Sequence, residues 1–116
     1  MYNIPINFNL EKLLGSLITQ ISYSINTISI FFDKVGFITI SGSFRINHKK
    51  FYDEIFPIKN DMGLLNMLGK KIINININND RDILCIVLDN QLKLELIGNK
   101  VYESYTINIG GKEIIV

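Results

Sequence analysis

The segment Met67–Gly98, MLGKKIINININNDRDILCIVLDNQLKLELIG, decides the fold because it contains three strand-like runs with turn residues between them. Isoleucine and asparagine alternate strictly in residues 73–78, and this period of two predicts a strand with all three isoleucines on one face. Residues 83–88, ILCIVL, are apolar on both faces, as in a strand covered on both sides. Leucine alternates with charged residues in 92–96. Because Asn- and Asp-rich turns separate the runs, the segment predicts a three-stranded antiparallel meander.

A weaker copy of this pattern lies in residues 14–42, about half of the chain earlier. The first turn differs by about two residues between the copies, and the matching positions resume after it. These positions, with the first copy named before the second, are Leu14 and Leu68, Gly15 and Gly69, Ile28 and Leu84, Asp33 and Asp89, and Gly42 and Gly98. We interpret the pattern as an internal duplication, although two unrelated meanders with equal turn lengths would also look alike.

The chain of 116 residues is expected to be one domain, with internal repeats over about residues 10–46 and 61–98 and a closing hairpin over 101–116. Short helices are expected at 10–14 and 61–68, because each follows an Asn or Asp cap and precedes a glycine. The predicted fold class is mainly β, a β-rich α+β domain whose two repeated meanders form a sandwich or an open barrel. Its expected core residues include Ile28, Ile30, Phe32, Ile86, Leu88, Leu94 and Leu96.

Further strands are expected on either side of the meanders. Residues 2–8 alternate, but Pro5 lacks an amide hydrogen and restricts this segment to an edge strand or an extended arm. Residues 37–46 and 101–109 each have the pattern of one long strand, and Gly110-Gly111 predicts a two-residue hairpin turn.

Composition and charge narrow the classes of function. The chain is 47% hydrophobic, enough for a core without disulfides, and its single cysteine, Cys85, is expected to be a small core residue. A net charge of +1 argues against a nucleic-acid partner. The first residues lack a basic region followed by an apolar run, and no apolar run is long enough to span a bilayer. We therefore expect a cytoplasmic protein without membrane contact.

The residue pattern predicts no catalytic, cofactor-binding or metal site. His48, the single histidine, stands beside lysines and is expected in an exposed loop. Asp33 and Asp89 could form a carboxylate pair, but both occur at turns, where Asp bonds to backbone. The turn at 78–82 resembles a calcium loop only loosely, because the glycine and the distal glutamate are missing. The expected protein is therefore not an enzyme and holds no cofactor.

The segment 45–57 combines residue types that are frequent at protein interfaces. Its candidate partner contacts are Arg45, Lys49, Lys50 and Tyr52. The segment has no obvious counterpart between Gly98 and Tyr102, so it could distinguish two otherwise similar halves. Its lysines would speed encounter with an acidic partner. Two alternatives are a connector whose Phe51 and Phe56 close one end of the core, and a platform for single-stranded nucleic acid.

The tetrapeptide Tyr102-Glu103-Ser104-Tyr105 is the most distinctive in the chain. In a strand, Glu103 would share a face with Tyr105 and Ile107 that is otherwise apolar. Such a carboxylate either discourages strand addition at a sheet edge or orients a specific partner. Glu103 and Tyr105 therefore join the candidate partner contacts.

Together with Leu13-Leu14-Gly15, Gly42-Ser43-Phe44 and the final residues YESYTINIGGKEIIV, this tetrapeptide resembles an uncharacterised family of small bacterial proteins. Members of that family have a duplicated β-meander and a late Tyr-Glu-(Ser/Ala)-(Tyr/Trp) motif before a final hairpin, and they look like immunity proteins of bacterial toxin systems. The resemblance implies a small cytosolic, non-catalytic protein that binds and blocks a cognate toxin. The alternative is a β domain that binds a small ligand or nucleic acid, and homodimerisation through an exposed edge strand is open in either case.

Overall fold

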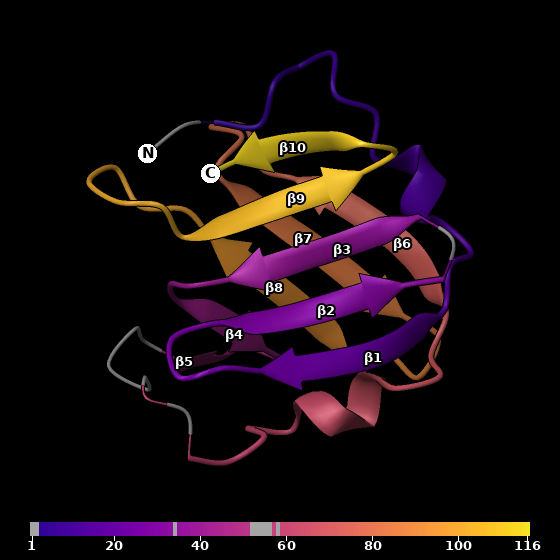
Figure 1. Ribbon diagram of the computed structural model, residues 1–116. Helices are drawn as coiled ribbons and strands as arrows, with labels where there is room; N and C mark the ends of the chain where they lie inside the picture. Colours follow the sequence, from indigo (N-terminus) through magenta and orange to yellow (C-terminus); the bar gives the residue numbers. More distant parts are fainter. Residues whose placement is uncertain (1–2, 34, 52–56, 58) are drawn as a thin grey trace.

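The computed structural model describes residues 3–33, 35–51, 57 and 59–116 (Figure 1). Two short 3-10 helices within these residues are η1 (Glu11–Leu13) and η3 (Leu64–Met67). The strands of the same residues are β1 (Ile18–Tyr23), β2 (Ile28–Phe32), β3 (Gly36–Ile40), β4 (Phe44–Ile46), β5 (Lys49–Phe51), β6 (Ile72–Ile77), β7 (Ile83–Leu88), β8 (Lys93–Ile97), β9 (Tyr105–Ile109) and β10 (Lys112–Ile115).

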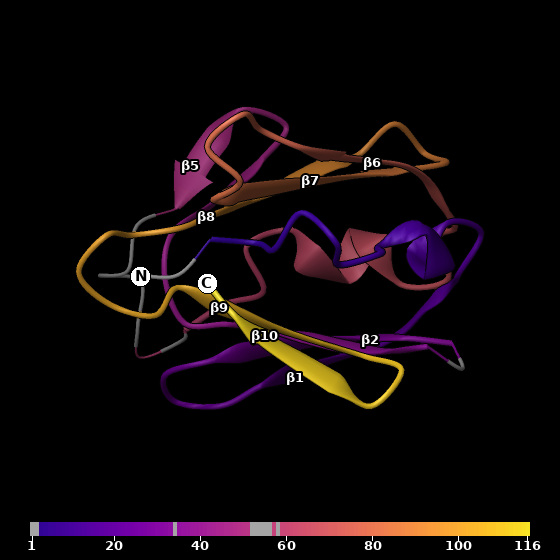
Figure 2. The ribbon, with the colours of Figure 1, turned by 90° about the horizontal axis from the view of Figure 1, so that it is seen from above.

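The described strands form two antiparallel five-stranded sheets that face each other (Figures 1 and 2). Sheet 1 has the order β1-β2-β3-β9-β10, and sheet 2 has the order β5-β4-β8-β7-β6. A single antiparallel bridge between Leu17 and Lys71 joins the two sheets at one corner. The predicted mainly β class is confirmed, and the two repeated meanders, β1–β3 and β6–β8, belong to the two layers of a sandwich.

The two meanders share an irregularity at the start of their first strands. In β1 the pairing with β2 shifts between Ile18 and Gln20, and in β6 the pairing with β7 shifts between Ile72 and Asn74. An extra residue in a strand interrupts the alternation of side chains between its faces. The expectation that Ile73 shares one face with Ile75 and Ile77 is therefore wrong: Ile72 is 1% exposed and takes the core position at the start of β6, whereas Ile73 is 48% exposed.

Reciprocal hydrogen bonds join the halves where the two meanders begin. The N–H of Gly15 donates to the carbonyl of Ile72, and the N–H of Gly69 donates to the carbonyl of Ile18, both at 2.8 Å. The two glycines have positive φ angles, +82° and +76°, which a residue with a Cβ adopts only at a cost. The repeated Leu-Gly pair therefore marks a backbone turn that each half uses to bond to the other.

Each half of the chain contributes a two-stranded hairpin to the sheet that contains the meander of the other half. The hairpin β4–β5 follows the first meander but pairs with β8 of the second, where Phe44 lies opposite Leu96. The hairpin β9–β10 follows the second meander but pairs with β3, where Tyr105 lies opposite Ile40. The segment 45–57 was expected to have no counterpart between Gly98 and Tyr102, and the strands that correspond to β4–β5 are β9–β10, which lie after that interval. We call residues equivalent when they hold the same position in the two halves, as Phe44 and Tyr105 do.

Two segments that were each expected to be one long strand contain shorter strands, because the chain crosses from one sheet to the other within them. We call the segments that pass between the sheets crossings. Residues 37–46 contain two strands, because the chain leaves sheet 1 after Ile40 and enters sheet 2 at Phe44. At Gly42 an added Cβ would lie 2.9 Å from the Cβ of Ser104, so the two crossing segments pack too closely for a side chain. Residues 101–104 lie outside β9 for the same reason, since they form the second crossing.

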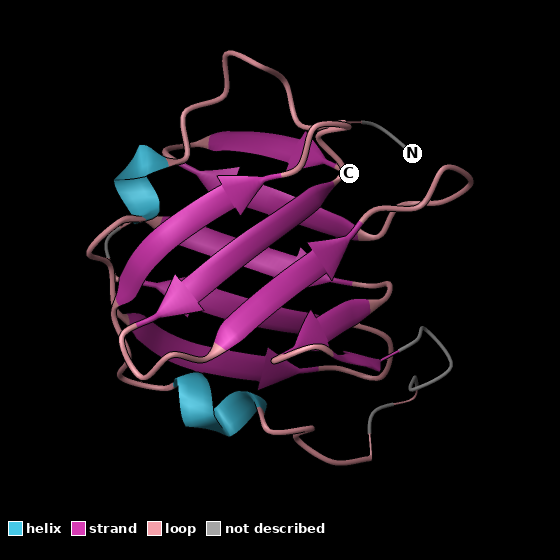
Figure 3. Cartoon of the chain, turned by 180° about the vertical axis from the view of Figure 1, so that it is seen from behind, coloured by secondary structure: helices cyan, strands magenta, loops and turns pink. Residues whose placement is uncertain are grey.

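Apolar side chains from both sheets fill the space between the layers. The expected core residues Ile28, Ile30, Phe32, Ile86, Leu88, Leu94 and Leu96 are each 4% exposed or less. The two expected short helices are present as single 3-10 turns, shorter than the ranges 10–14 and 61–68, and they lie near opposite edges of the sandwich (Figure 3). Each contributes two or fewer buried side chains, among them Leu13 and Met67.

The segment before η1 is an arm and not an edge strand. Its N–H at Ile4 donates to the carbonyl of Arg81 at 2.7 Å, and the Ile4 side chain is 1% exposed. Ile6, expected on the same face as Ile4, is 87% exposed. At the end of the arm the Oδ1 atom of Asn9 accepts a hydrogen bond from the N–H of Glu11, although the N-cap position of η1 is held by Leu10 and not, as expected, by Asn9.

Candidate protein-binding surface

The hairpin β4–β5 places three of the predicted contacts on one short structural unit. Its turn is formed by Asn47 and His48, which have φ angles of +48° and +75°, and His48 is exposed there as expected. Arg45 lies directly opposite Lys50 on the neighbouring strand. The Nζ atom of Lys49 lies 5.3 Å from the centre of the Phe51 ring. Cationic and aromatic side chains are thus held together at this edge of sheet 2.

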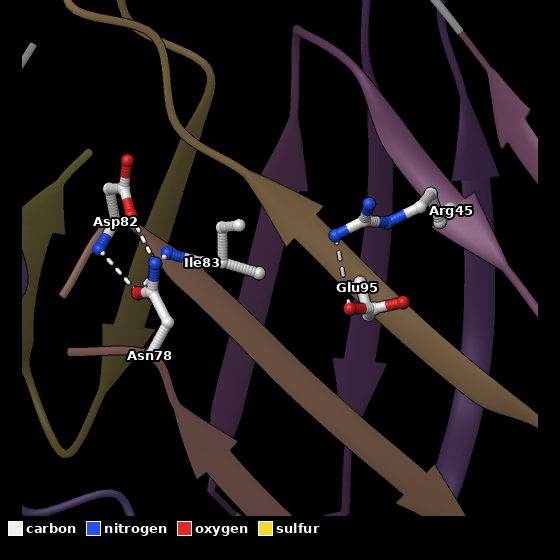
Figure 4. A network of polar contacts seen from close by, with 5 residues as sticks. All are labelled: Arg45, Asn78, Asp82, Ile83 and Glu95. Atoms are coloured by element: carbon white, nitrogen blue, oxygen red, sulfur yellow. Dashed lines mark hydrogen bonds and ion pairs between the residues drawn. The ribbon is translucent and has the colours of Figure 1, made fainter. Parts of the chain in front are cut away.

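An ion pair fixes the side chain of Arg45 on the outer face of sheet 2. The Nη2 atom of Arg45 lies 3.2 Å from the Oε2 atom of Glu95 on β8 (Figure 4). The side chains are 33% and 14% exposed, so Glu95 is the better shielded of the two. The Nε atom of Arg45 is buried and has no hydrogen-bond acceptor within the described residues. The Arg45 side chain keeps 33% of its surface exposed beside this ion pair.

A row of outward-facing residues crosses all five strands of sheet 2. Paired positions on neighbouring strands define this row, which we call the charged row: Lys50, Arg45, Glu95, Cys85 and Asn76. Cys85 lies between Glu95 and Asn76 in this row, it is 8% exposed, and burial raises the pKa of its thiol above the usual value. The prediction that Cys85 is buried is confirmed, but it is covered by its neighbours on the outer face and not by the core between the sheets.

The equivalent row on sheet 1 has no charge. It consists of Ile115, Thr106, Thr39, Ser29 and Ser22, which pair in the same way across β10, β9, β3, β2 and β1. We call it the hydroxyl row. The Oγ atom of Ser29 and the Oγ1 atom of Thr39 lie 3.0 Å apart and are hydrogen-bonded. The two halves thus share a backbone arrangement, and the charge on their outer faces distinguishes them.

The remaining residues of the predicted segment 45–57 have different positions. Phe51 is half-buried and stacks on the buried Phe44 with ring centres 5.2 Å apart, as the core-closing alternative expects of this aromatic. The predicted contact Tyr52 and the predicted core residue Phe56 lie outside the described residues. Arg45, Lys49 and Lys50 are therefore the predicted contacts that the structure brings together here.

The second group of predicted contacts requires a correction. The side chain of Tyr105 is fully buried, so a partner cannot touch it. Glu103 is exposed but lies before β9, and it does not share a strand face with Tyr105 and Ile107 as expected. Its carbonyl accepts a hydrogen bond of 3.3 Å from the Oγ atom of Ser41, which ties the second crossing to the first. Glu103 remains on the surface at the end of the sandwich where the crossings meet.

The turn at 78–82 has the backbone-bonding role expected of its Asn and Asp residues. The Oδ1 atom of Asn78 accepts hydrogen bonds of 2.9 Å from the N–H groups of both Asp82 and Ile83, and its Nδ2 atom donates to the Asp82 carboxylate (Figure 4). Sequence reasoning missed Arg81 beside it, whose guanidinium group donates to the carbonyls of Ile4 and Pro5. A positive φ of 58° at Arg81 allows this contact, and no residue pattern along the chain indicates it.

A polar cleft of about 520 Å³ lies beside this turn. Its lining residues are Asn3, Asn79, Asp80, Arg81, Asp82, Asn99 and Lys100. No group of three His, Cys, Asp or Glu side chains that could hold a metal ion occurs among the described residues. The cleft carries both signs of charge, and Arg81 and Asp82 in it are already bonded to protein atoms.

Family models, curated proteins and solved structures were compared with this chain, and none of the three comparisons found a match. No helix in the described part of the chain is long and apolar enough to cross a membrane. The class of protein is therefore defined by the structure alone: a β-sandwich of two sheets with exchanged hairpins, one outer face of which is charged.

Proposed function

We propose that this protein is a non-enzymatic protein-binding module, and that it acts in the cytoplasm as an immunity protein that binds and blocks a cognate bacterial toxin. The observation that carries the proposal is the hairpin β4–β5, which presents Arg45, Lys49 and Lys50 at an exposed edge of sheet 2. Arginine is enriched among the residues that dominate binding energy in protein interfaces. The specific assignment to toxin immunity rests on the family resemblance of the sequence.

The geometry of the hairpin supports this role because the contacts are largely preorganised. Binding costs free energy when flexible side chains must be ordered at the interface. The ion pair with Glu95 already restricts Arg45, and the ring of Phe51 lies below the ammonium group of Lys49. Cations placed in this way would both attract an acidic partner during encounter and contribute to the docked complex.

The test uses the toxin-like product of a reading frame next to the gene as the probe. Co-expression of the protein should restore growth of cells that make this product, and the two purified proteins should bind. The double charge reversal Lys49→Glu/Lys50→Glu should weaken binding at least about tenfold, or about 1.4 kcal/mol. The melting temperature should barely move, because both lysines are exposed.

A matched control is the reversal Lys70→Glu/Lys71→Glu, which makes the same change of charge in two adjacent lysines before β6. Binding should be retained in this variant. Equal losses in both variants would mean that only the overall charge matters. An unchanged affinity in Lys49→Glu/Lys50→Glu would remove these two lysines from the interface and shift attention to Glu103, the exposed candidate contact on the closing part of the chain. Failure to restore growth or to bind would contradict the function itself.

A further inference from the structure

We propose that the partner docks an acidic surface on the outer face of sheet 2, with Arg45 at the centre of the contact, and this inference rests on the proposed function. Sheet 1 has an outer face of the same backbone form, so a choice between two similar faces is required. The charged row and the hydroxyl row pair in the same way, but the first contains charged side chains and the second contains none, and this difference favours the outer face of sheet 2.

Cations outnumber carboxylates on the outer face of sheet 2. Within the described strands β4, β5 and β8, the outward-facing charges are Lys50, Arg45, Lys93 and Glu95. Neighbouring strands lie about 4.8 Å apart, and charges are screened over a distance of about 8 Å at physiological salt. These charges are therefore close enough to act together, and the resulting field favours carboxylates on the partner.

On sheet 1 the corresponding strands offer no such field. The strands equivalent to β4, β5 and β8 are β9, β10 and β3, and the one charge among their outward-facing residues is the carboxylate of Glu113, beside Thr106, Asn108, Ile115, Phe37 and Thr39. The rings of Phe31 and Phe37 lie 5.2 Å apart and are half-buried against each other. An acidic partner that docked on this face would lose hydration, would meet the Glu113 carboxylate and would gain no contact with an outward-facing cation of these strands. Electrostatic complementarity therefore selects sheet 2.

The position of Arg45 within the row gives it the central role. It lies between Lys50 on one side and Glu95 on the other. Glu95 uses one end of the guanidinium group and thereby acts as a positioning residue, while about one third of the Arg45 side chain stays exposed. The planar guanidinium group can bind a carboxylate through two parallel N–H groups, which an ammonium group cannot do.

The experiment titrates the protein with a synthetic, end-capped pentaglutamate peptide and follows backbone amide signals by NMR. Shifts should concentrate at Lys50, Arg45, Glu95 and Cys85, and the hydroxyl row should stay unchanged. Arg45→Gln should weaken peptide binding about tenfold, and Arg45→Lys should lie between this variant and the wild type. Lys50→Gln, at an exposed position, should also weaken binding and does not depend on the fold tolerating a change at Arg45.

The matched control is Lys112→Gln, which removes one exposed charge from β10, the strand equivalent to β5. It should leave peptide affinity within about twofold of the wild type. The inference is overturned if Lys112→Gln weakens binding as much as Arg45→Gln, if shifts fall on both sheets, or if the peptide does not bind. Binding of the toxin-like protein that is insensitive to Arg45→Gln would also overturn it while the proposed function stands. Peptide binding at the charged row without growth rescue would instead contradict the function alone.

Discussion

The hydroxyl of Tyr105 donates a hydrogen bond of 2.8 Å to the backbone carbonyl oxygen of Asp82, across the interior of the sandwich. Tyr105 begins β9 in sheet 1, and Asp82 stands just before β7 in sheet 2. The same carbonyl accepts the N–H of Gly98 at 2.8 Å, so the second half crosses between the sheets close to this point. A buried polar group is costly unless it is bonded, and this contact satisfies the hydroxyl of a fully buried tyrosine.

The first prediction concerns the strength of this contact. Tyr105→Phe keeps the ring in the core and removes only the hydroxyl, while the Asp82 carbonyl keeps its bond to Gly98. The free energy of unfolding should fall by about 0.5–1.5 kcal/mol, the usual net contribution of one hydrogen bond. Urea unfolding at neutral pH measures this loss. An increase in stability would mean that the hydroxyl is poorly accommodated in the core.

The second prediction concerns alkaline pH. Burial raises the pKa of Tyr105 above its usual value of about 10, and the nearby Asp82 raises it further. The folded protein therefore retains the phenolic proton where the unfolded chain has lost it, so stability falls as the pH rises above about 10. The free energy of unfolding of the wild type should therefore lose its excess over that of Tyr105→Phe as the pH rises above about 10.

Comparison of the two proteins is needed because a second tyrosine also titrates. Burial, with a smaller contribution from Asp61, raises the pKa of Tyr23 to about 12, and this residue is present in both proteins. The difference between their unfolding free energies, measured from neutral pH upward, isolates Tyr105. A difference that stays constant above about pH 10 would contradict the prediction.

The third prediction concerns the face of each strand that packs in the core. Ile86→Ala and Leu94→Ala should each cost about 2–5 kcal/mol, because both side chains are 1% exposed or less and truncation leaves a cavity. Ile73→Ala is the control, since the irregularity in β6 turns Ile73 to solvent, and its cost should be about 0.5 kcal/mol or less. Similar losses in all three variants would mean that Ile73 faces the core.

The fourth prediction concerns Cys85. The thiolate reacts with thiol reagents, and a raised pKa combined with 8% exposure keeps the reactive form scarce and shielded. Native protein should therefore be labelled slowly, and urea-unfolded protein rapidly. Cys85→Ala should retain partner binding and cost about 1 kcal/mol. Rapid labelling of native protein would show that the charged row opens around this residue.

Local patterns were sufficient to predict the parts of the fold that depend on neighbours in the chain. The alternation around Leu94 and the apolar run around Ile86 place both residues in the core as expected, because side-chain period and turn residues act over a few positions. The irregularity at Ile73 was not predictable in this way. It depends on how β6 aligns with β7, and strict alternation along the chain contains no sign of it.

The residue types of the candidate surface could be predicted from the sequence, but the way in which the fold brings these residues together could not. Arg45 and Lys50 were recognised from residue type, whereas the contribution of Glu95 follows from the pairing of β4 with β8, far apart in the chain. Glu103 was misplaced because the alternation in 101–109 continues through the crossing segment, which has the composition of a strand without its pairing, whereas Tyr105 shares the buried face of β9 with Ile107 as the alternation predicts. Long-range pairing therefore accounts for both the missed partner and the misplaced contact.

The exchanged hairpins have a consequence for the order of events during synthesis. Residues of β3 leave the ribosome long before their partner β9, so the pairing edge of β3 stays open until nearly all described strands have been made. Proteins whose contacts join distant parts of the chain fold slowly, in about milliseconds to seconds, because chain entropy is lost before contacts form. Until β9 arrives, the nascent first meander presents an unpaired edge on which another chain can add a strand. Chaperones that bind the nascent chain, and translation fast enough to deliver β9 early, would both limit aggregation through this edge.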